Sequence, residues 1–165
     1  MAIAYIALGG NVGDVRETFR QAIAALCAQA RAGLLARSSD YRTPPWGDTA
    51  QADFINACIA VTTELAPHAL LAALQTVERR FGRDRAREHR YGPRTLDLDL
   101  IAYDDMRLDT PDLTLPHPGA LARAFVLVPL AEIAPGLMLG DTRVDAALAR
   151  LPTTGISRLP DPGAD

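Results

Sequence analysis

The segment from Asp97 to Asp99 places two carboxylates at alternate positions in a stretch that otherwise reads as a β-strand. Aspartate is depleted in strands because its short side chain competes for backbone hydrogen bonds, so the pair indicates a role beyond folding. Side chains two residues apart in a strand point the same way, so the two acids share one face while Leu96, Leu98 and Leu100 pack into the core. Such a pair can share Mg²⁺, which takes one or two carboxylates and fills its other positions with water and phosphate oxygens. A strand with one solvated, acidic face is the alternative.

Arginines crowd the sequence before these acids. All 17 basic residues of the chain are arginines, and seven lie between residues 79 and 94: Arg79, Arg80, Arg83, Arg85, Arg87, Arg90 and Arg94. Guanidinium groups match phosphate geometry and stay charged at any working pH, so arginines beside a carboxylate pair favour transfer of a phosphorylated group. The alternative is a solvated charge run balanced by Asp84 and Glu88. The absence of lysine excludes the Walker-type phosphate loop and Schiff-base chemistry.

The segment TPPWG at residues 43–47 is the next unusual stretch. Proline fixes φ and lacks an N–H, so two in a row hold neighbouring carbonyls in a rigid, extended chain that can accept hydrogen bonds from a flat heterocycle. A rigid turn anchored by Trp46 is the alternative. Phe54 and Asn56 share one face of a predicted strand and offer an aromatic plane and an amide that both donates and accepts. The two residues fit a planar, nitrogen-rich ligand.

A last cluster is LTLPHP at residues 113–118, followed by Arg123 and Phe125. His117 lies between two prolines and outside any apolar periodic run. A ligand contact and a loop-capping role are therefore both open for this histidine.

Hydrophobic spacing predicts the elements that must position these residues. In chain order they are a strand at residues 2–8, a helix at 15–30, strands at 34–41 and 53–63, a helix from Pro67 to just before Gly82, and a strand at 96–103. This order is the split βαβ arrangement, β-α-β-β-α-β, which predicts an α+β, ferredoxin-like fold: an antiparallel four-stranded sheet with both helices packed on one face. The connections at 42–52 and 83–95 exceed the usual length of about 4–6 residues, as functional loops often do.

Composition narrows the class of protein. With 165 residues, 48% of them hydrophobic, the composition predicts a single globular domain over residues 1–165, in which about 151–165 is a loosely attached tail rich in Pro and Gly. A net charge of −3 and a pI near 5.6 argue against nucleic acid or a membrane as partner. Cys27 and Cys58 sit in apolar contexts without Cys-x-x-Cys spacing, which predicts free thiols and a reducing cytoplasm. We expect a cytoplasmic monomer that acts on small molecules.

The motifs together resemble those of the 6-hydroxymethyl-7,8-dihydropterin pyrophosphokinases of folate biosynthesis. The matching stretches run in family order from residue 5 to about 135: YIALGGN at 5–11, YRTPP at 41–45, FIN at 54–56, GPRTLDLD at 92–99, LPHP at 115–118 and RAFVL at 123–127. GPRTLDLD is the most specific of them. The resemblance implies transfer of a pyrophosphoryl group from the co-substrate ATP to the hydroxymethyl group of the pterin, with release of AMP.

The resemblance also implies a role for each matching residue. Asp97 and Asp99 would hold two Mg²⁺ ions that bridge the triphosphate, and Arg83 and Arg94 would be catalytic cations that close over the phosphates. Phe54 and Phe125 would sandwich the pterin, whose edge would be read by Thr43, Pro45, Trp46, Asn56 and Asp97. The ATP site would be lined by Glu78, Arg85, Tyr91, Leu100, Thr114, His117 and Arg123. Which of Arg85, Arg87 and Arg90 contacts ATP stays open.

A rival interpretation belongs to another functional class. The chain would then be a non-catalytic, ferredoxin-like regulatory module that binds a nucleotide or metabolite. Its acidic pair and its arginines would sense the ligand without turning it over. Release of AMP that depends on the pterin separates the enzyme from the module.

Overall fold

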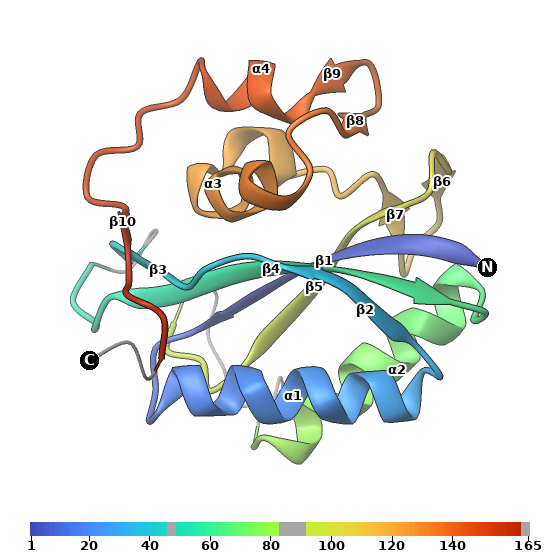
Figure 1. Ribbon diagram of the computed structural model, residues 1–165, viewed down its shortest axis with the longest axis horizontal. Coiled ribbons are helices and arrows are strands. Elements are labelled where there is room, and N and C mark those ends of the chain that lie inside the picture. The colour runs from blue at the N-terminus through green and yellow to red at the C-terminus, as the bar shows by residue number, and fades with distance from the viewer. Residues whose placement is uncertain (46–48, 83–91, 163–165) are drawn as a thin grey trace.

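The structure of the protein is a computed structural model that describes residues 1–45, 49–82 and 92–162 (Figure 1). Within these residues the central sheet is antiparallel and has six strands. They are β1 (Ala2–Gly10), β2 (Gly33–Arg37), β3 (Tyr41–Thr43), β4 (Phe54–Thr63), β5 (Asp97–Tyr103) and β10 (Ser157–Arg158). The order across the sheet is β10-β3-β4-β1-β5, and β2 pairs with β4 further along that strand.

Helices cover both faces of the sheet and give three layers (Figure 1). One face carries α1 (Val15–Gln29) and α2 (Pro67–Arg80), and the other carries α3 (Ala124–Ile133) and α4 (Val144–Leu148). The remaining short elements are β6 (Leu108–Asp109), β7 (Thr114–Leu115), the 3₁₀ turn η1 (Ala120–Ala122), β8 (Met138–Leu139) and β9 (Thr142–Arg143). A search of the described ranges finds no helix with the length and apolar character needed to cross a bilayer.

The first two helices form where sequence spacing predicts them. The side chain of Asp14 accepts a hydrogen bond from the backbone N–H of Glu17 at 3.2 Å, which caps α1, and Phe19 and Leu26 are fully buried on the inner face of this helix. Pro67 begins α2. At this position a backbone N–H has no partner within the helix, so the N–H that proline lacks is not needed. Both predicted helices are confirmed to within about two residues, the usual scatter of helix ends.

Each face of the sheet has its own apolar core. Leu98 and Leu100 of β5 belong to the core beneath α1 and α2, whereas Ile101 belongs to the core beneath α3. Because side chains alternate along a strand, Asp97 and Asp99 face the α3 side of the sheet, as Ile101 does. The predicted alternation of acids and leucines is confirmed.

The α+β class and the antiparallel sheet with packed helices are confirmed, but the prediction of four strands is wrong, because the sheet has six. The predicted strand at 34–41 is divided into β2 and β3. Between them, the hydroxyl of Ser38 accepts the hydrogen bond of Cys58 N–H at 2.9 Å, and Asp40 turns inward to bind two arginines. At this bend a side-chain hydroxyl takes the place of one backbone acceptor, while Ser38 N–H still donates to Cys58 O at 2.9 Å. The hydrophobic pattern does not reveal this break.

The second helical layer and β10 are not among the elements that the sequence pattern predicts. Helix α3 is apolar along most of its length and contains Pro129, so it lacks the one-sided periodicity by which α1 and α2 are recognised. Of residues 151–165, the predicted tail, Ser157 and Arg158 form β10, which pairs with β3.

Candidate active site

The two aspartates lie at the start of β5, on the face of the sheet that α3 covers. Asp97 is opposite Gly9 of β1 and Asp99 is opposite Ala7, and both acids are half-buried. Burial raises the pKa of the Cys58 thiol, and the charge of Asp99 raises it further. Asp99 and Cys58 are both opposite Ala7, one on each side of β1, and Cys58 lies in the core beneath α3. The structure brings both acids to one face, as their spacing predicts.

The two carboxylates at this face could form part of a magnesium site. In residues 1–45, 49–82 and 92–162, no three or more His, Cys, Asp or Glu side chains come together in a way that could hold a metal. Mg²⁺ is commonly bound through one or two carboxylates, with water and substrate phosphates as the other ligands. Asp97 and Asp99 supply such an incomplete set.

An amide faces the acids across β1. Asn56 of β4 is 8% exposed, and its Nδ2 donates to the hydroxyl of Thr43, itself 1% exposed, at 2.7 Å. Gly9 lies between Asn56 and Asp97: a Cβ at position 9 would be 2.9 Å from Asn56 Oδ1 and 4.0 Å from Asp97 Cβ. The glycine therefore leaves open the space between an amide and a carboxylate on one face of the sheet.

A histidine, an arginine and an aromatic ring lie in the loop after β7 and at the start of α3. The guanidinium of Arg123 lies 6.0 Å from the ring centroid of Phe125, at the start of α3. Burial lowers the pKa of His117, the charge of Arg123 lowers it further, and the charge of Asp97 acts in the opposite sense. The backbone N–H of His117 donates to Ile101 O at 2.8 Å, which fixes the loop after β7 against β5. His117 and Arg123 both lie beside Gly119, whose N–H donates to His117 Nδ1 at 3.1 Å and whose Cβ, if present, would lie 3.0 Å from Arg123 Cζ.

The protonation of His117 tests this arrangement. In the metal-free protein we expect its pKa to lie below the ordinary value of 6.5, so that the ring is neutral at pH 7. Because the folded pKa is the lower one, the ring contributes stability above the unfolded pKa, and this contribution is lost as the pH falls through the folded pKa. Asp97→Asn should lower the pKa of His117 further, and Arg123→Gln should raise it. NMR titration of the ring measures both shifts. A His117 pKa that is unchanged in both variants would contradict the placement of Asp97 and Arg123 near this ring.

Glu78 and Leu100, assigned to the ATP site by resemblance, have side chains on the other side of the sheet. Leu100 packs in the core beneath α1 and α2. Glu78 of α2 is 1% exposed, and its carboxylate accepts the hydrogen bond of Leu98 N–H at 2.9 Å. Glu78 thereby holds the backbone between the two acids, and the structure does not bring its side chain to their face.

Asn11 is a residue that the sequence analysis did not single out. Its Oδ1 accepts from Arg94 N–H, and its own N–H donates to Arg94 O, both at 2.9 Å. Its Nδ2 donates to Gln51 Oε1 and Ala52 O, also at 2.9 Å. Asn11 thus joins the loop after β1 to the segments that lead into β5 and β4. Its place in the YIALGGN stretch was the only signal in the sequence.

The other predicted site residues divide into two groups. Pro45 and Phe54 are half-buried on the two sides of the β3–β4 connection, Thr114 lies in β7, and the Arg94 guanidinium donates to Gly92 O at 2.7 Å. The remaining predicted residues lie outside the described part of the chain: Trp46, Arg83, Arg85, Arg87, Arg90 and Tyr91.

Comparisons with known proteins agree with this geometry. Residues 5–135 match the model of the family described as 7,8-dihydro-6-hydroxymethylpterin-pyrophosphokinase (HPPK). The chain is 48% identical over 159 residues to the 2-amino-4-hydroxy-6-hydroxymethyldihydropteridine pyrophosphokinase of Methylorubrum extorquens, covering 96% of this chain and 99% of the relative. It is 45% identical over 157 residues to the protein of the same name from Pseudomonas aeruginosa, covering 94% of this chain and 96% of that protein.

Solved structures show the same fold at low sequence identity. An HPPK-DHPS in complex with substrates has a TM-score of 0.68 at 13% identity, and Plasmodium falciparum HPPK-DHPS with SDX-DHP has one of 0.66 at 12% identity. Each match covers 90% of this chain and 43% of the solved chain, so the chain spans less than half the length of these structures.

Proposed function

The chain belongs to the 7,8-dihydro-6-hydroxymethylpterin-pyrophosphokinase family, and on that premise we propose that it transfers a pyrophosphoryl group from ATP to the hydroxymethyl group of 6-hydroxymethyl-7,8-dihydropterin in folate biosynthesis. The observation that carries the proposal is that Asp97 and Asn56 flank Gly9 on one face of the sheet. This arrangement suits a nitrogen-rich ring next to a metal-bound phosphate chain.

The pterin lies, in this proposal, between the rings of Phe54 and Phe125. Aromatic faces bind a flat heterocycle by stacking, and the amide of Asn56 can both donate to and accept from its edge. Because Asn56 Nδ2 already donates to Thr43, the orientation of the amide is fixed before the ligand binds. Pro45, Trp46 and Asp97 complete the edge contacts.

His117, Arg123 and Thr114 bind the nucleotide. His117 Nδ1 accepts the hydrogen bond of Gly119 N–H at 3.1 Å, so the proton of the neutral ring is assigned to Nε2. This N–H can donate to a phosphate oxygen, while Arg123 supplies a fixed positive charge. Arg85 and Tyr91 remain further proposed members of the ATP site, whereas the side chains of Glu78 and Leu100, also expected there by resemblance, lie on the other face of the sheet.

Transfer of a phosphoryl-type group depends mainly on positioning and charge stabilisation. Two Mg²⁺ ions, when bound, would neutralise phosphate oxygens and help align the attacking and leaving oxygens. Asp97 and Asp99 would hold the ions, and Asp97 would also face the hydroxymethyl group, whose proton it could accept. Arg83 and Arg94 stabilise the charge that develops on the transferred group.

We propose the ferredoxin-like split βαβ arrangement as the scaffold of a single catalytic domain. The order β3-β4-β1-β5, with α1 after β1 and α2 after β4, supports it.

We also propose that the protein is cytoplasmic and works as a monomer, in line with its acidic pI and its two free cysteines.

Product analysis tests the function. The purified chain, incubated with ATP and Mg²⁺, should release AMP only when the hydroxymethyl pterin is present, in equal amount with pterin diphosphate. EDTA should abolish the release. Tight ATP binding without AMP would favour the regulatory module instead.

A further inference from the structure

The chain beyond the family match contributes a strand to the edge of the sheet. The match ends at residue 135, whereas Ser157 of β10 lies opposite Arg42 of β3 and Arg158 lies opposite Tyr41. Leu159 N–H then donates to Asp40 O at 2.9 Å. Residues 155–160, which we call the strap, therefore run along the outer edge of β3 (Figure 1).

β3 needs such support because it has only three residues. On its inner side it pairs with β4, and on its outer side it pairs with the strap. It ends at Thr43, which accepts from Asn56, and leads directly into Pro44 and Pro45. A Cβ on Gly155 would lie 3.4 Å from Pro44 Cγ, so the strap also packs against this proline. The strap thus contacts the segment that presents the proposed pterin wall.

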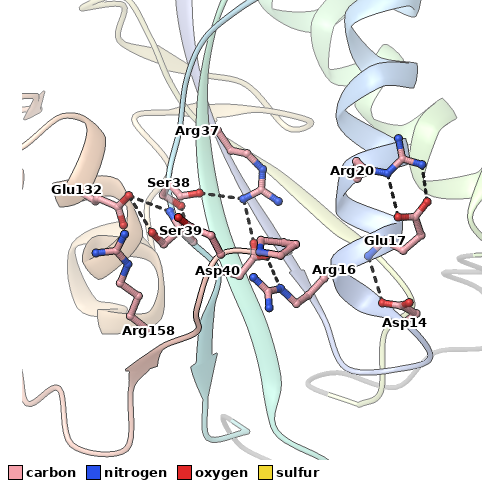
Figure 2. Close-up of a pocket in the computed structure, with 12 residues that line it drawn as sticks. Asp14, Arg16, Glu17, Arg20, Arg37, Ser38, Ser39, Asp40, Glu132 and Arg158 are labelled. Carbon is pink, nitrogen blue, oxygen red and sulfur yellow. Dashed lines mark hydrogen bonds and ion pairs between the residues drawn. The ribbon is translucent and has the colours of Figure 1, made fainter. Parts of the chain in front are cut away.

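A partly buried ion pair network anchors the strap to the rest of the protein (Figure 2). Asp40, 2% exposed, accepts from Arg16 Nε of α1 at 2.9 Å and from Arg37 Nη1 of β2 at 3.0 Å. Arg16 also donates to Pro160 O at 2.6 Å. One arginine therefore joins α1, the bend between β2 and β3, and the strap. Arg16, Arg37 and Asp40 line a pocket of about 700 Å³. They form ion pairs with one another there, as do Glu17 and Arg20 of the same pocket.

Helix α3 holds the same bend from the other side. Glu132 accepts hydrogen bonds from Ser39 N–H at 2.9 Å and from the hydroxyl of Tyr41. Figure 2 shows Glu132 and Arg16 on opposite sides of the bend. With three anchors on residues 39–41, a loss of the strap should shift the end of β3 rather than unfold the sheet.

We propose that the strap is a positioning element for the pterin side of the active site. It holds β3 in register, and so fixes Thr43 and the Pro44–Pro45 segment for the incoming ring. The inference rests on the proposed function and adds a specific consequence. His117 lies in the loop after β7 and Arg123 lies just before α3, whereas the strap pairs with β3, so the strap should affect the pterin and not ATP.

Steady-state kinetics of three variants tests the proposal. One chain ends at Thr154, the second carries Leu159→Pro, which removes the N–H that donates to Asp40, and the third carries Leu159→Ala, which keeps it. For the first two we expect the pterin KM to rise about tenfold or more, with the ATP KM changed less than about twofold, as slight misplacement of a positioning group predicts. Leu159→Ala should stay closer to the unmodified protein. Arg107→Ala, which removes an exposed ion pair with Asp141, serves as the control.

The outcomes distinguish failure of the proposed function from failure of the inference about the strap. If the unmodified chain makes no pterin-dependent AMP, the proposed function fails. If it does, and both strap variants keep the parental pterin KM, the inference fails. Equal increases of the two KM values would also overturn it, because they would indicate a general structural effect. Should the shortened chain not fold, as thermal unfolding would reveal, Leu159→Pro compared with Leu159→Ala decides.

Discussion

Replacement of either Asp97 or Asp99 by Asn is expected to lower kcat by about 10³-fold or more, near the upper end of what loss of one electrostatic stabiliser causes. Each substitution removes a negative oxygen from the proposed magnesium site but keeps the shape of the side chain. Both acids are half-buried on the α3 face, while the leucines between and beside them carry the packing of β5. Both substitutions should therefore lower kcat without unfolding the protein.

The control is Asp105→Asn, which changes an exposed carboxylate away from this face. Its kcat should equal that of the unmodified chain. Circular dichroism and thermal unfolding should show all three variants folded. Parental kcat in both Asp97→Asn and Asp99→Asn would remove the metal assignment.

Arg94→Ala is expected to raise the transition-state barrier by about 2–4 kcal/mol, as loss of one charged stabiliser does elsewhere. The substitution removes the guanidinium together with its hydrogen bond to Gly92 O, while Asn11 still binds both the N–H and the C=O of residue 94 and so holds the loop. The barrier in Arg94→Lys should lie between those of the unmodified chain and Arg94→Ala, because lysine keeps the charge but not the paired hydrogen bonds. Single-turnover rates measure the effect, and an unchanged rate in Arg94→Ala would assign this arginine to the solvated surface.

Local spacing predicted the parts of the site that depend on strand alternation. The pattern of β5 placed Asp97 and Asp99 opposite Leu98 and Leu100 correctly, because a period of two follows directly from backbone geometry. The same rule put Phe54 and Asn56 on one face of β4. The caps and apolar stripes of α1 and α2 were equally visible.

What the sequence did not reveal depends on contacts between distant segments. The break between β2 and β3 comes from Asp40, which binds arginines of α1 and β2. Asn11 joins loops whose residues lie 40 and 83 positions away. The outer helical layer has no amphipathic pattern because α3 is apolar along most of its length. Such features are set by tertiary packing, which no local pattern encodes.

A crystal structure of the chain with Mg²⁺, a non-hydrolysable ATP analogue and the hydroxymethyl pterin tests the central claim most directly. The account predicts magnesium about 2.0–2.1 Å from carboxylate oxygens of both Asp97 and Asp99, with phosphate oxygens among its other ligands. The pterin should stack on Phe125 beside Asn56. Magnesium and phosphates bound elsewhere, with the two acids pointing into bulk solvent, would contradict it.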